Sequence, residues 1–190
     1  AARERLLRGL LSPVFGCSPQ DLQFAREPRG RPYLVGAPAG FDFNFSGTRG
    51  GSLLAVALGL RVGVDLERLD RRPPALPLAR RYFEAAEAEA MAALPEPQQV
   101  PAFLHAWTAK EAACKATGSG LRERLAAWRF ALDAEGADPR LLAAPAEAGA
   151  PSRWSLRRLS PAPGFTAVIA AAGPIRALRL RLATCVQSAG

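Results

Sequence analysis

The predicted secondary-structure elements follow one another in an order that limits the possible folds. Alternating segments at 41–46 and 61–69 precede a helix-favouring region at 77–118, and further alternating segments follow at 153–160, 165–172 and 176–183. Successive side chains of a strand point to opposite faces, so this alternation predicts strands. A group of strands, then helices, then strands indicates an α+β fold. We expect the last three strands to form an antiparallel sheet with one solvated face.

Two helices are expected in the middle of the chain. The stretch 77–94 consists of strong helix formers and begins with proline. The stretch 99–118 reads "QVPAFLHAWTAKEAACKATG" and ends at Gly118, a typical C-terminal cap. The other expected elements are a helix closed by Pro13 and Gly16, a strand at 22–25, a buried strand at 52–59 and a surface loop at 134–152.

The charge balance favours anionic partners. The chain of 190 residues has 25 Lys and Arg against 17 Asp and Glu, a formal net charge of +8. This excess attracts nucleic acid, phosphorylated small molecules or an acidic protein. The arginines are dispersed and no aromatic-basic recognition motif is present, so nucleic acid is the least favoured of these partners.

Cysteine usage and hydropathy indicate a cytoplasmic protein. Cys17, Cys114 and Cys185 are odd in number and form no C-x-x-C pair, which predicts neither a disulfide framework nor a zinc site. The longest apolar run, 53–60, is far shorter than a membrane span. The first fifteen residues lack the apolar centre of a signal peptide.

Two carboxylates share one face of the strand expected around 62–67. In "GVDLE", Asp65 and Glu67 alternate with apolar side chains and therefore point to the same side. Adjacent carboxylates raise each other's cost of ionisation unless a cation lies between them. The alternative interpretation is a solvated strand edge on which Arg68 supplies the counter-charge.

The two lysines of the chain lie close together in the second predicted helix. Lys110 and Lys115 flank Glu111, and all other basic residues are arginine. Glu111 and Lys115 can form an i, i+4 pair that only stabilises the helix. A lysine ammonium, however, is a compact charge on a flexible stem and can follow a phosphate oxygen better than a planar guanidinium. With Asp65 and Glu67, these residues form a candidate site for a hard divalent ion and phosphate oxygens.

These motifs resemble the paired signatures of the 4'-phosphopantetheinyl transferases, in the Sfp-type branch with the W-x-x-K-E-A variant. That family has a G-x-D-x-E strand and, about forty residues later, W-x-x-K-E-A-x-x-K; here they read "GVDLE" and "WTAKEAACK". "GRP" and "FNFS" are similar to the family's G-K-P and F-N-x-S signatures. The resemblance runs from about Leu6 to Leu121 and more loosely through the later strands.

The resemblance implies a fold of two similar α/β lobes, a pseudo-dimer with antiparallel sheets and the active site between the lobes. We expect an N-terminal lobe at 1–72, incomplete because its start is missing relative to the family, and a C-terminal lobe at 73–190. The long helix carries the WTAKEAACK motif. A monomer without membrane or nucleic-acid partners is expected.

The resemblance also implies an activity. Such enzymes transfer the 4'-phosphopantetheine arm of coenzyme A to a serine of an apo acyl or peptidyl carrier protein and release adenosine 3',5'-bisphosphate. The W-x-x-K-E-A form favours carriers of polyketide or fatty acid biosynthesis. Coenzyme A and carrier proteins are both anionic, in keeping with the positive charge of this chain.

Site roles carry over by matching position. The implied metal ligands for magnesium, or manganese, on the pyrophosphate are Asp65, Glu67 and Glu111. Glu111 is also the implied general base for the carrier serine, directly or through water. Lys115 is the second implied catalytic residue, and together with Lys110 it steadies the phosphate and the leaving group. The implied coenzyme A contacts are Arg29, Arg31, Ser46, Thr48, Lys110 and Lys115.

Two departures from the family pattern leave an alternative open. The family has histidine after the F-N-x-S serine, whereas this chain has Gly47. Thr48, Arg49 or the amides of the glycine-rich turn are candidates to replace that contact. Gly47 and the start that is short relative to the family leave an alternative interpretation. It is a non-catalytic relative that binds coenzyme A or a carrier protein. Of the other candidate reactive side chains, His105 is expected to be a helix-surface or packing residue, and Cys114 a small residue buried in the helix packing.

Overall fold

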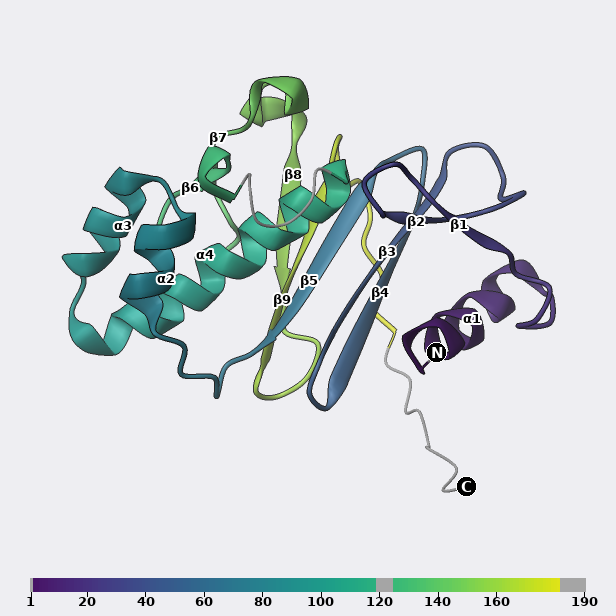
Figure 1. The fold of residues 1–190 in the computed structure, drawn as a ribbon, viewed down its shortest axis with the longest axis horizontal. Helices are drawn as coiled ribbons and strands as arrows, with labels where there is room; N and C mark the ends of the chain where they lie inside the picture. The colour runs from purple at the N-terminus through teal and green to yellow at the C-terminus, as the bar shows by residue number, and fades with distance from the viewer. Residues whose placement is uncertain (1, 119–124, 182–190) are drawn as a thin grey trace.

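The computed structural model describes residues 2–118 and 125–181, and within them the protein has the predicted α+β architecture. The helices are α1 (Ala2–Phe15), α2 (Ala75–Tyr82), α3 (Ala85–Ala92) and α4 (Glu96–Thr117), with short 3-10 turns at Leu125–Ala127, Ala146–Ala148 and Pro151–Arg153. The strands are β1 (Phe24–Arg26), β2 (Pro32–Leu34), β3 (Phe41–Thr48), β4 (Gly51–Leu58), β5 (Val62–Arg68), β6 (Arg129–Phe130), β7 (Leu141–Ala143), β8 (Ser155–Leu159) and β9 (Phe165–Ala171). Figure 1 shows α4 lying along β5 and β9, with α1 at the opposite end of the molecule from α2 and α3.

The central sheet has the order β5-β9-β8 and is antiparallel, as expected for the segments after the helices. The expected solvated face is wrong for β9, which is buried from Thr166 to Ala171. Helix α4 covers one face of this strand, and residues of β4 such as Ala55 pack with Ile169 on the other. Residues 176–181 form no strand, and the rest of that predicted strand lies outside the described residues.

Strand β3 is attached to the central sheet through its polar side chains. Its three aromatic side chains pack in a core cluster with residues of α1. The polar side chains of its opposite face are buried, and they accept hydrogen bonds from backbone N–H groups of β5. The bonds are Val62 N to Asp42 Oδ2 (2.8 Å), Val64 N to Asn44 Oδ1 (2.9 Å) and Leu66 N to Ser46 Oγ (3.2 Å). They satisfy the edge of β5 that β9 leaves unpaired.

Several local predictions need correction. The helix expected at 77–94 is divided, because the chain extends at Phe83 and Glu84 and a new helix starts there. Glu84 caps α3 in a reciprocal capping box with Glu87. Pro77 is the third residue of α2 rather than its first. Strand β4 is not buried throughout, since it lies at the edge of a two-stranded sheet and exposes Leu58. The loop expected at 134–152 includes β7.

Glycine at position 63 permits the close approach of α4 to β5. A Cβ at Gly63 would lie 2.0 Å from the carbonyl oxygen of Ala112 and 2.4 Å from the amide nitrogen of Ala116. Only a residue without a side chain fits at this contact. The contact sets the helix residues around 111–115 above the β5 face that carries Asp65 and Glu67.

The division into lobes at residue 72 stays a prediction, as does the pseudo-dimer. Strand β5 precedes this boundary in the chain, yet it pairs with β9. Helix α4, in the second half, packs on both of these strands. Among the described residues, no helix has the length and apolar character needed to span a bilayer.

Candidate active site

A pocket with a volume of about 560 Å³ lies between α4, β5 and the end of β3. Its walls come from the loop at 29–32, from 44–48 of β3, from 65–67 of β5 and from one side of α4. The predicted site residues that line it are Arg29, Arg31, Ser46, Thr48, Asp65, Glu67, Glu111 and Lys115. The sequence motifs therefore meet in one cavity, although they are far apart in the chain.

Asp65 and Lys115 form an ion pair in this pocket. Lys115 Nζ lies 2.6 Å from Asp65 Oδ1 and 3.1 Å from Ser46 Oγ. The Ser46 hydroxyl donates to the same Asp65 oxygen at 2.9 Å. The other carboxylate oxygen, Asp65 Oδ2, is buried and has no hydrogen-bond partner among the described residues. Ser46 thus fixes the pair, a role that differs from the expected contact with the nucleotide.

Glu67 lies two residues along the same face and pairs with Arg71. Burial raises the pKa of Glu67 above its ordinary value of 4.5, and the nearby Asp65 charge raises it further. The hydrogen bond from Arg71 lowers this pKa and so opposes both effects. Two carboxylates in one poorly solvated place favour a cation between or beside them. Arg71 supplies one such cation, and sequence reasoning had missed it.

Glu111 lies one turn before Lys115 on α4 and is almost fully buried on the pocket wall. Trp107 and Cys114 line the same side of the helix. Cys114 is 1% exposed, which confirms that it is a packing residue. The sequence predicted that these residues lie on one helix. It did not show which face of that helix forms the pocket.

Lys110 does not reach the pocket, contrary to the expectation that it contacts a phosphate. Its side chain is fully buried on another side of α4. Its Nζ donates to Glu87 Oε2 of α3 at 2.7 Å and to the carbonyl oxygens of Leu125 and Trp128. Burial lowers the pKa of Lys110, and the Glu87 carboxylate opposes this. Lys110 joins α3, α4 and the turn at 125–128.

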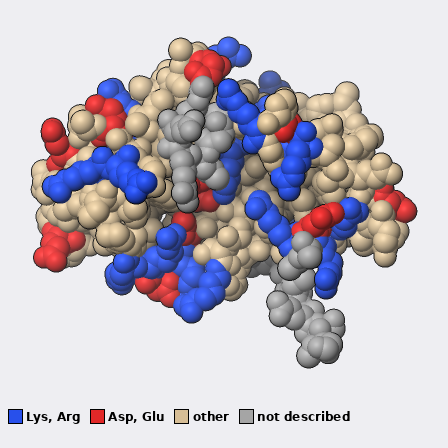
Figure 2. All heavy atoms as spheres, viewed as in Figure 1, with Lys and Arg blue, Asp and Glu red and all other residues tan. Residues whose placement is uncertain are grey.

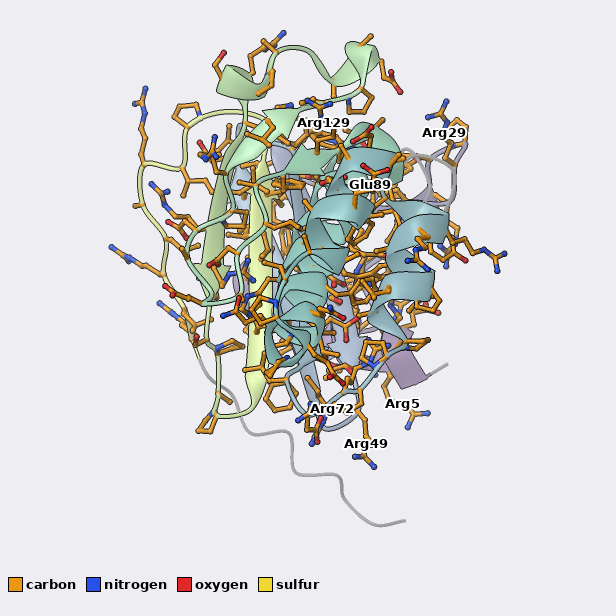
Figure 3. The ribbon with its side chains drawn as sticks, turned by 90° about the vertical axis from the view of Figure 1, so that its left-hand side faces the viewer. Arg5, Arg29, Arg49, Arg72, Glu89 and Arg129 are labelled. Atoms are coloured by element: carbon orange, nitrogen blue, oxygen red, sulfur yellow. The ribbon has the colours of Figure 1, made fainter. Side chains whose placement is uncertain are left out.

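The arginines expected to contact coenzyme A differ in their surroundings. Arg31 is buried and its guanidinium binds Asp42 through two hydrogen bonds of 2.7 and 2.8 Å. It also donates to the carbonyl oxygens of Val62 and Lys115, at 2.7 and 3.0 Å. Arg31 therefore lies at the pocket wall with its charge already neutralised. Arg29 lines the pocket, is exposed, and extends outward from the loop (Figure 3).

Of the candidates to replace the family histidine, Thr48 lines the pocket and Arg49 does not. Gly47 and Thr48 line the pocket. A Cβ at Gly47 would lie 3.1 Å from Ser52 Oγ, so space there is limited. Arg49 is not a pocket residue; it sits at the β3–β4 turn and points away from the protein body (Figure 3). The Arg49 version of that expectation is not supported.

Of the remaining candidates, His105 lies away from the pocket, whereas Gly118 lines it. His105 is buried, as the packing interpretation predicted, and its Nδ1 lies 3.1 Å from the carbonyl oxygen of Asp133. Gly118 is the left-handed C-cap of α4, with φ of 68°. The next two residues, Ser119 and Gly120, lie outside the described residues.

Arg3 of α1 is a further pocket residue that the sequence did not reveal. Its guanidinium donates to the carbonyl oxygen of Phe45 at 3.1 Å and lies 5.1 Å above the Phe45 ring. No motif links position 3 to the pocket, so no sequence signal identified it. Elsewhere, Lys and Arg side chains are spread over several parts of the surface with Asp and Glu among them (Figure 2).

The carboxylates of the pocket decide whether a divalent ion fits. Within 2–118 and 125–181, no three Asp, Glu, His or Cys side chains converge as a metal-binding group, so the expected three-carboxylate arrangement is not observed. Magnesium needs fewer protein ligands, because it is commonly held by one or two carboxylates, water and substrate phosphates. The buried, unpartnered Asp65 Oδ2 beside Glu67 fits such a partial site.

Comparison with known proteins agrees with this geometry. Residues 61–172, which include β5, α4 and β9, match the 4'-phosphopantetheinyl transferase superfamily. The chain belongs to this superfamily of transferases, which confirms the family predicted from the motifs.

Individual relatives support the assignment over different lengths. The 4'-phosphopantetheinyl transferase HetI of Nostoc is 36% identical over 171 residues, covering 88% of this chain and 68% of HetI. A putative 4'-phosphopantetheinyl transferase of Synechocystis is 37% identical over 118 residues, covering 60% and 47%. Sfp of Bacillus subtilis is 26% identical over 132 residues, covering 69% and 57%. The chain thus spans from about half to two thirds of the length of these relatives.

Proposed function

We propose that this protein transfers the 4'-phosphopantetheine arm of coenzyme A to a serine hydroxyl of an apo acyl or peptidyl carrier protein. The serine oxygen forms a bond to the phosphorus that carries the pantetheine arm. The bond from this phosphorus to the bridging pyrophosphate oxygen breaks, and adenosine 3',5'-bisphosphate leaves with that oxygen. Membership of the transferase superfamily supports this reaction class.

The observation that carries the proposal is the meeting of both signature motifs in one pocket. Asp65 and Glu67 of β5 line it together with Glu111 and Lys115 of α4. Phosphoryl transfer needs neutralised phosphate charge and a positioned nucleophile, and acids and bases in one cavity can supply both. The volume of about 560 Å³ is in the range of small-molecule sites.

Glu111 is the proposed general base. Glu111 lines the pocket on the same side of α4 as Lys115. A carboxylate there can accept the proton of the carrier serine, directly or through one water, as its oxygen attacks. The nearby Lys115 ammonium would stabilise negative charge on the phosphate oxygens.

Asp65 and Glu67 are the proposed protein ligands of a magnesium or manganese ion, with Glu111 as the further candidate. Asp65 Oδ2, which has no hydrogen-bond partner within the described part of the chain, supports this choice. When bound, such an ion supplies charge neutralisation at the pyrophosphate. Arg29 and Thr48 are the proposed contacts for the rest of coenzyme A, since both line the pocket and Arg29 forms no ion pair among the described residues.

Mass spectrometry tests the proposal. The protein is incubated with coenzyme A, magnesium and purified apo carrier proteins, which include acyl and peptidyl carriers of polyketide and fatty acid synthesis. We expect the carrier to gain the mass of one phosphopantetheine group. Glu111→Gln should reduce the rate by roughly 100-fold or more, because a positioned base contributes about that much.

A matched control uses another glutamate. Glu89 of α3 is exposed and is not a pocket residue (Figure 3), so Glu89→Gln removes the same charge without touching the site. Its rate should equal that of the wild type. Coenzyme A binding with no mass gain on any carrier would instead favour the non-catalytic alternative.

A further inference from the structure

The Asp65 carboxylate already has a cationic partner within the protein. Lys115 Nζ lies 2.6 Å from Asp65 Oδ1, and the Lys115 and Asp65 side chains are only 18% and 8% exposed. Ser46 Oγ holds the same two groups, at 3.1 and 2.9 Å. The ammonium therefore occupies one oxygen of the carboxylate that is the proposed metal ligand, while the other oxygen has no partner among the described residues.

A divalent ion at Asp65 would lie close to this ammonium. Two cations on one poorly solvated carboxylate repel each other, and the low local dielectric strengthens that repulsion. Arg71, which pairs with the neighbouring Glu67, adds a third positive charge to the same wall. Metal binding at Asp65 is therefore opposed by the protein's own cations.

The Lys115 side chain can leave Asp65 while its backbone stays in place. The Lys115 carbonyl oxygen accepts a hydrogen bond from Arg31 Nε at 3.0 Å and one from Gly118 N at 3.3 Å. These bonds fix the main chain at the end of α4. The four-carbon stem of lysine remains free to rotate, and the ammonium can move to a phosphate oxygen.

We propose that Lys115 is a resident counter-cation of Asp65, and that a divalent ion binds there tightly only when a diphosphate ligand draws the ammonium away. This inference rests on the proposed function, because coenzyme A is the diphosphate ligand it invokes. The metal and coenzyme A then bind with positive coupling, and each raises the affinity for the other by the same factor. Metal alone binds weakly.

Manganese binding, followed by the electron paramagnetic resonance signal of free Mn²⁺, tests this without any activity measurement. Lys115→Met removes the competing ammonium and keeps an unbranched, flexible side chain that is one atom shorter. We expect it to bind Mn²⁺ alone roughly 5- to 150-fold more tightly than the wild type, the usual range of coupling between sites. Coenzyme A should strengthen Mn²⁺ binding by a larger factor in the wild type than in Lys115→Met.

Arg29→Met is the matched control, because it removes one positive charge from the same pocket at a residue with no carboxylate partner among the described residues. Its Mn²⁺ affinity should stay near the wild-type value. An equal gain in Mn²⁺ affinity in Arg29→Met would mean that any positive charge in the pocket weakens metal binding. That result would overturn direct competition between the Lys115 ammonium and the ion. Unchanged or weaker Mn²⁺ binding by a folded Lys115→Met protein would also overturn it.

Two further measurements keep the inference separate from the proposed function. Asp65→Asn should abolish the Mn²⁺ binding that coenzyme A promotes, and binding that survives this change would put the ion elsewhere and overturn the inference. Should Lys115→Met fail to fold, the wild type alone decides: Mn²⁺ affinity that coenzyme A leaves unchanged rejects the coupling. Transfer to a carrier, measured by mass, can succeed or fail independently of these results.

Discussion

The two lysines of α4 form the same kind of ion pair in opposite surroundings. Lys110 pairs with Glu87 at 2.7 Å, with side-chain exposures of 0% and 7%. Lys115 pairs with Asp65 at 2.6 Å, at the wall of an open pocket. The first pair joins α4 to α3 and the second joins α4 to β5.

The difference lies in what else each ammonium contacts. Lys110 Nζ also donates to the carbonyl oxygens of Leu125 and Trp128 and lies 4.5 Å from the centre of the Phe83 ring, so all its bonding capacity is used inside the protein. Lys115 Nζ has Ser46 as its other partner, and Asp65 Oδ2 accepts no hydrogen bond from the described residues. A fully satisfied buried pair stabilises one arrangement, whereas a partly satisfied pair beside solvent can exchange partners.

Removing Lys110 should have the largest effect on stability. Lys110→Met leaves Glu87 buried without its cation, which typically costs about 3–5 kcal/mol. It also removes the donor to two backbone carbonyls. We expect urea denaturation to show that loss for Lys110→Met and a smaller one for Lys115→Met, because the Lys115 side chain is 18% exposed at the pocket wall whereas that of Lys110 is fully buried. Equal losses would contradict the contrast between the two pairs.

A double variant separates the charge from the packing. In Lys110→Met with Glu87→Leu, no unpaired charge stays buried, and stability should recover part of the loss of the single variant. Recovery should be incomplete, because Glu87 Oε1 also accepts a hydrogen bond from Phe130 N at 3.0 Å. A double variant less stable than Lys110→Met would show that the unpaired Glu87 charge is not the main cause of the loss.

Local patterns predicted much of the fold. The helix at 99–118 and its glycine cap were identified because helical spacing and a left-handed glycine are local properties. The alternation of β3 and β5 likewise placed Asp65 and Glu67 on one face. The helix at 77–94 was predicted as continuous because its composition favours helix throughout, and the capping role of Glu84 was not recognised.

The sequence predicted those site residues that belong to a family motif. It did not predict side-chain positions that depend on partners far away in the chain. Asp65, Glu67, Glu111 and Lys115 line the pocket as the motif implied. The position of Lys110 depends on Glu87, which is 23 residues away in the sequence. No local pattern distinguishes a lysine that turns toward a buried partner from one that turns toward a ligand.

Displacing α4 from β5 should affect the Lys115–Asp65 pair more than the Lys110–Glu87 pair. In Gly63→Ala the new methyl group would lie 2.0 Å from a backbone oxygen of α4, so the helix must shift. Overpacking costs typically 1–3 kcal/mol, and we expect about 3 kcal/mol here because backbone rather than side chain is contacted. Transfer to the carrier should fall with it, since Lys115 moves relative to Asp65.

Gly9→Ala is the control for that substitution. Gly9 lies in α1, where an added Cβ meets nothing within 4 Å. Alanine there should stabilise the protein by up to about 1 kcal/mol, because it favours helix over glycine. Thermal unfolding of the two variants tests this, and a Gly63→Ala protein as stable as Gly9→Ala would contradict the close contact of α4 with β5.

The smallest expected effect on stability comes from the protonation of His105, a buried residue of α4 that does not line the pocket. Burial lowers its pKa below the ordinary 6.5, and the Arg158 charge acts in the same direction. The folded state therefore binds fewer protons than the unfolded state below pH 6.5, and stability falls as the pH drops from 6.5 through the lowered pKa. The loss amounts to about 1.4 kcal/mol for each unit of difference between the two pKa values.

Nuclear magnetic resonance can measure this directly, because the chain has one histidine. Its ring signals should titrate below pH 6.5 in the folded protein and near 6.5 in urea. In His105→Gln, the slope of stability against pH in this range should be shallower than in the wild type, while transfer activity should change little because His105 is not a pocket residue. Titration of the folded ring at or above 6.5 would mean that His105 is hydrated, and α4 would then have a second solvated side besides the one that bears Lys115.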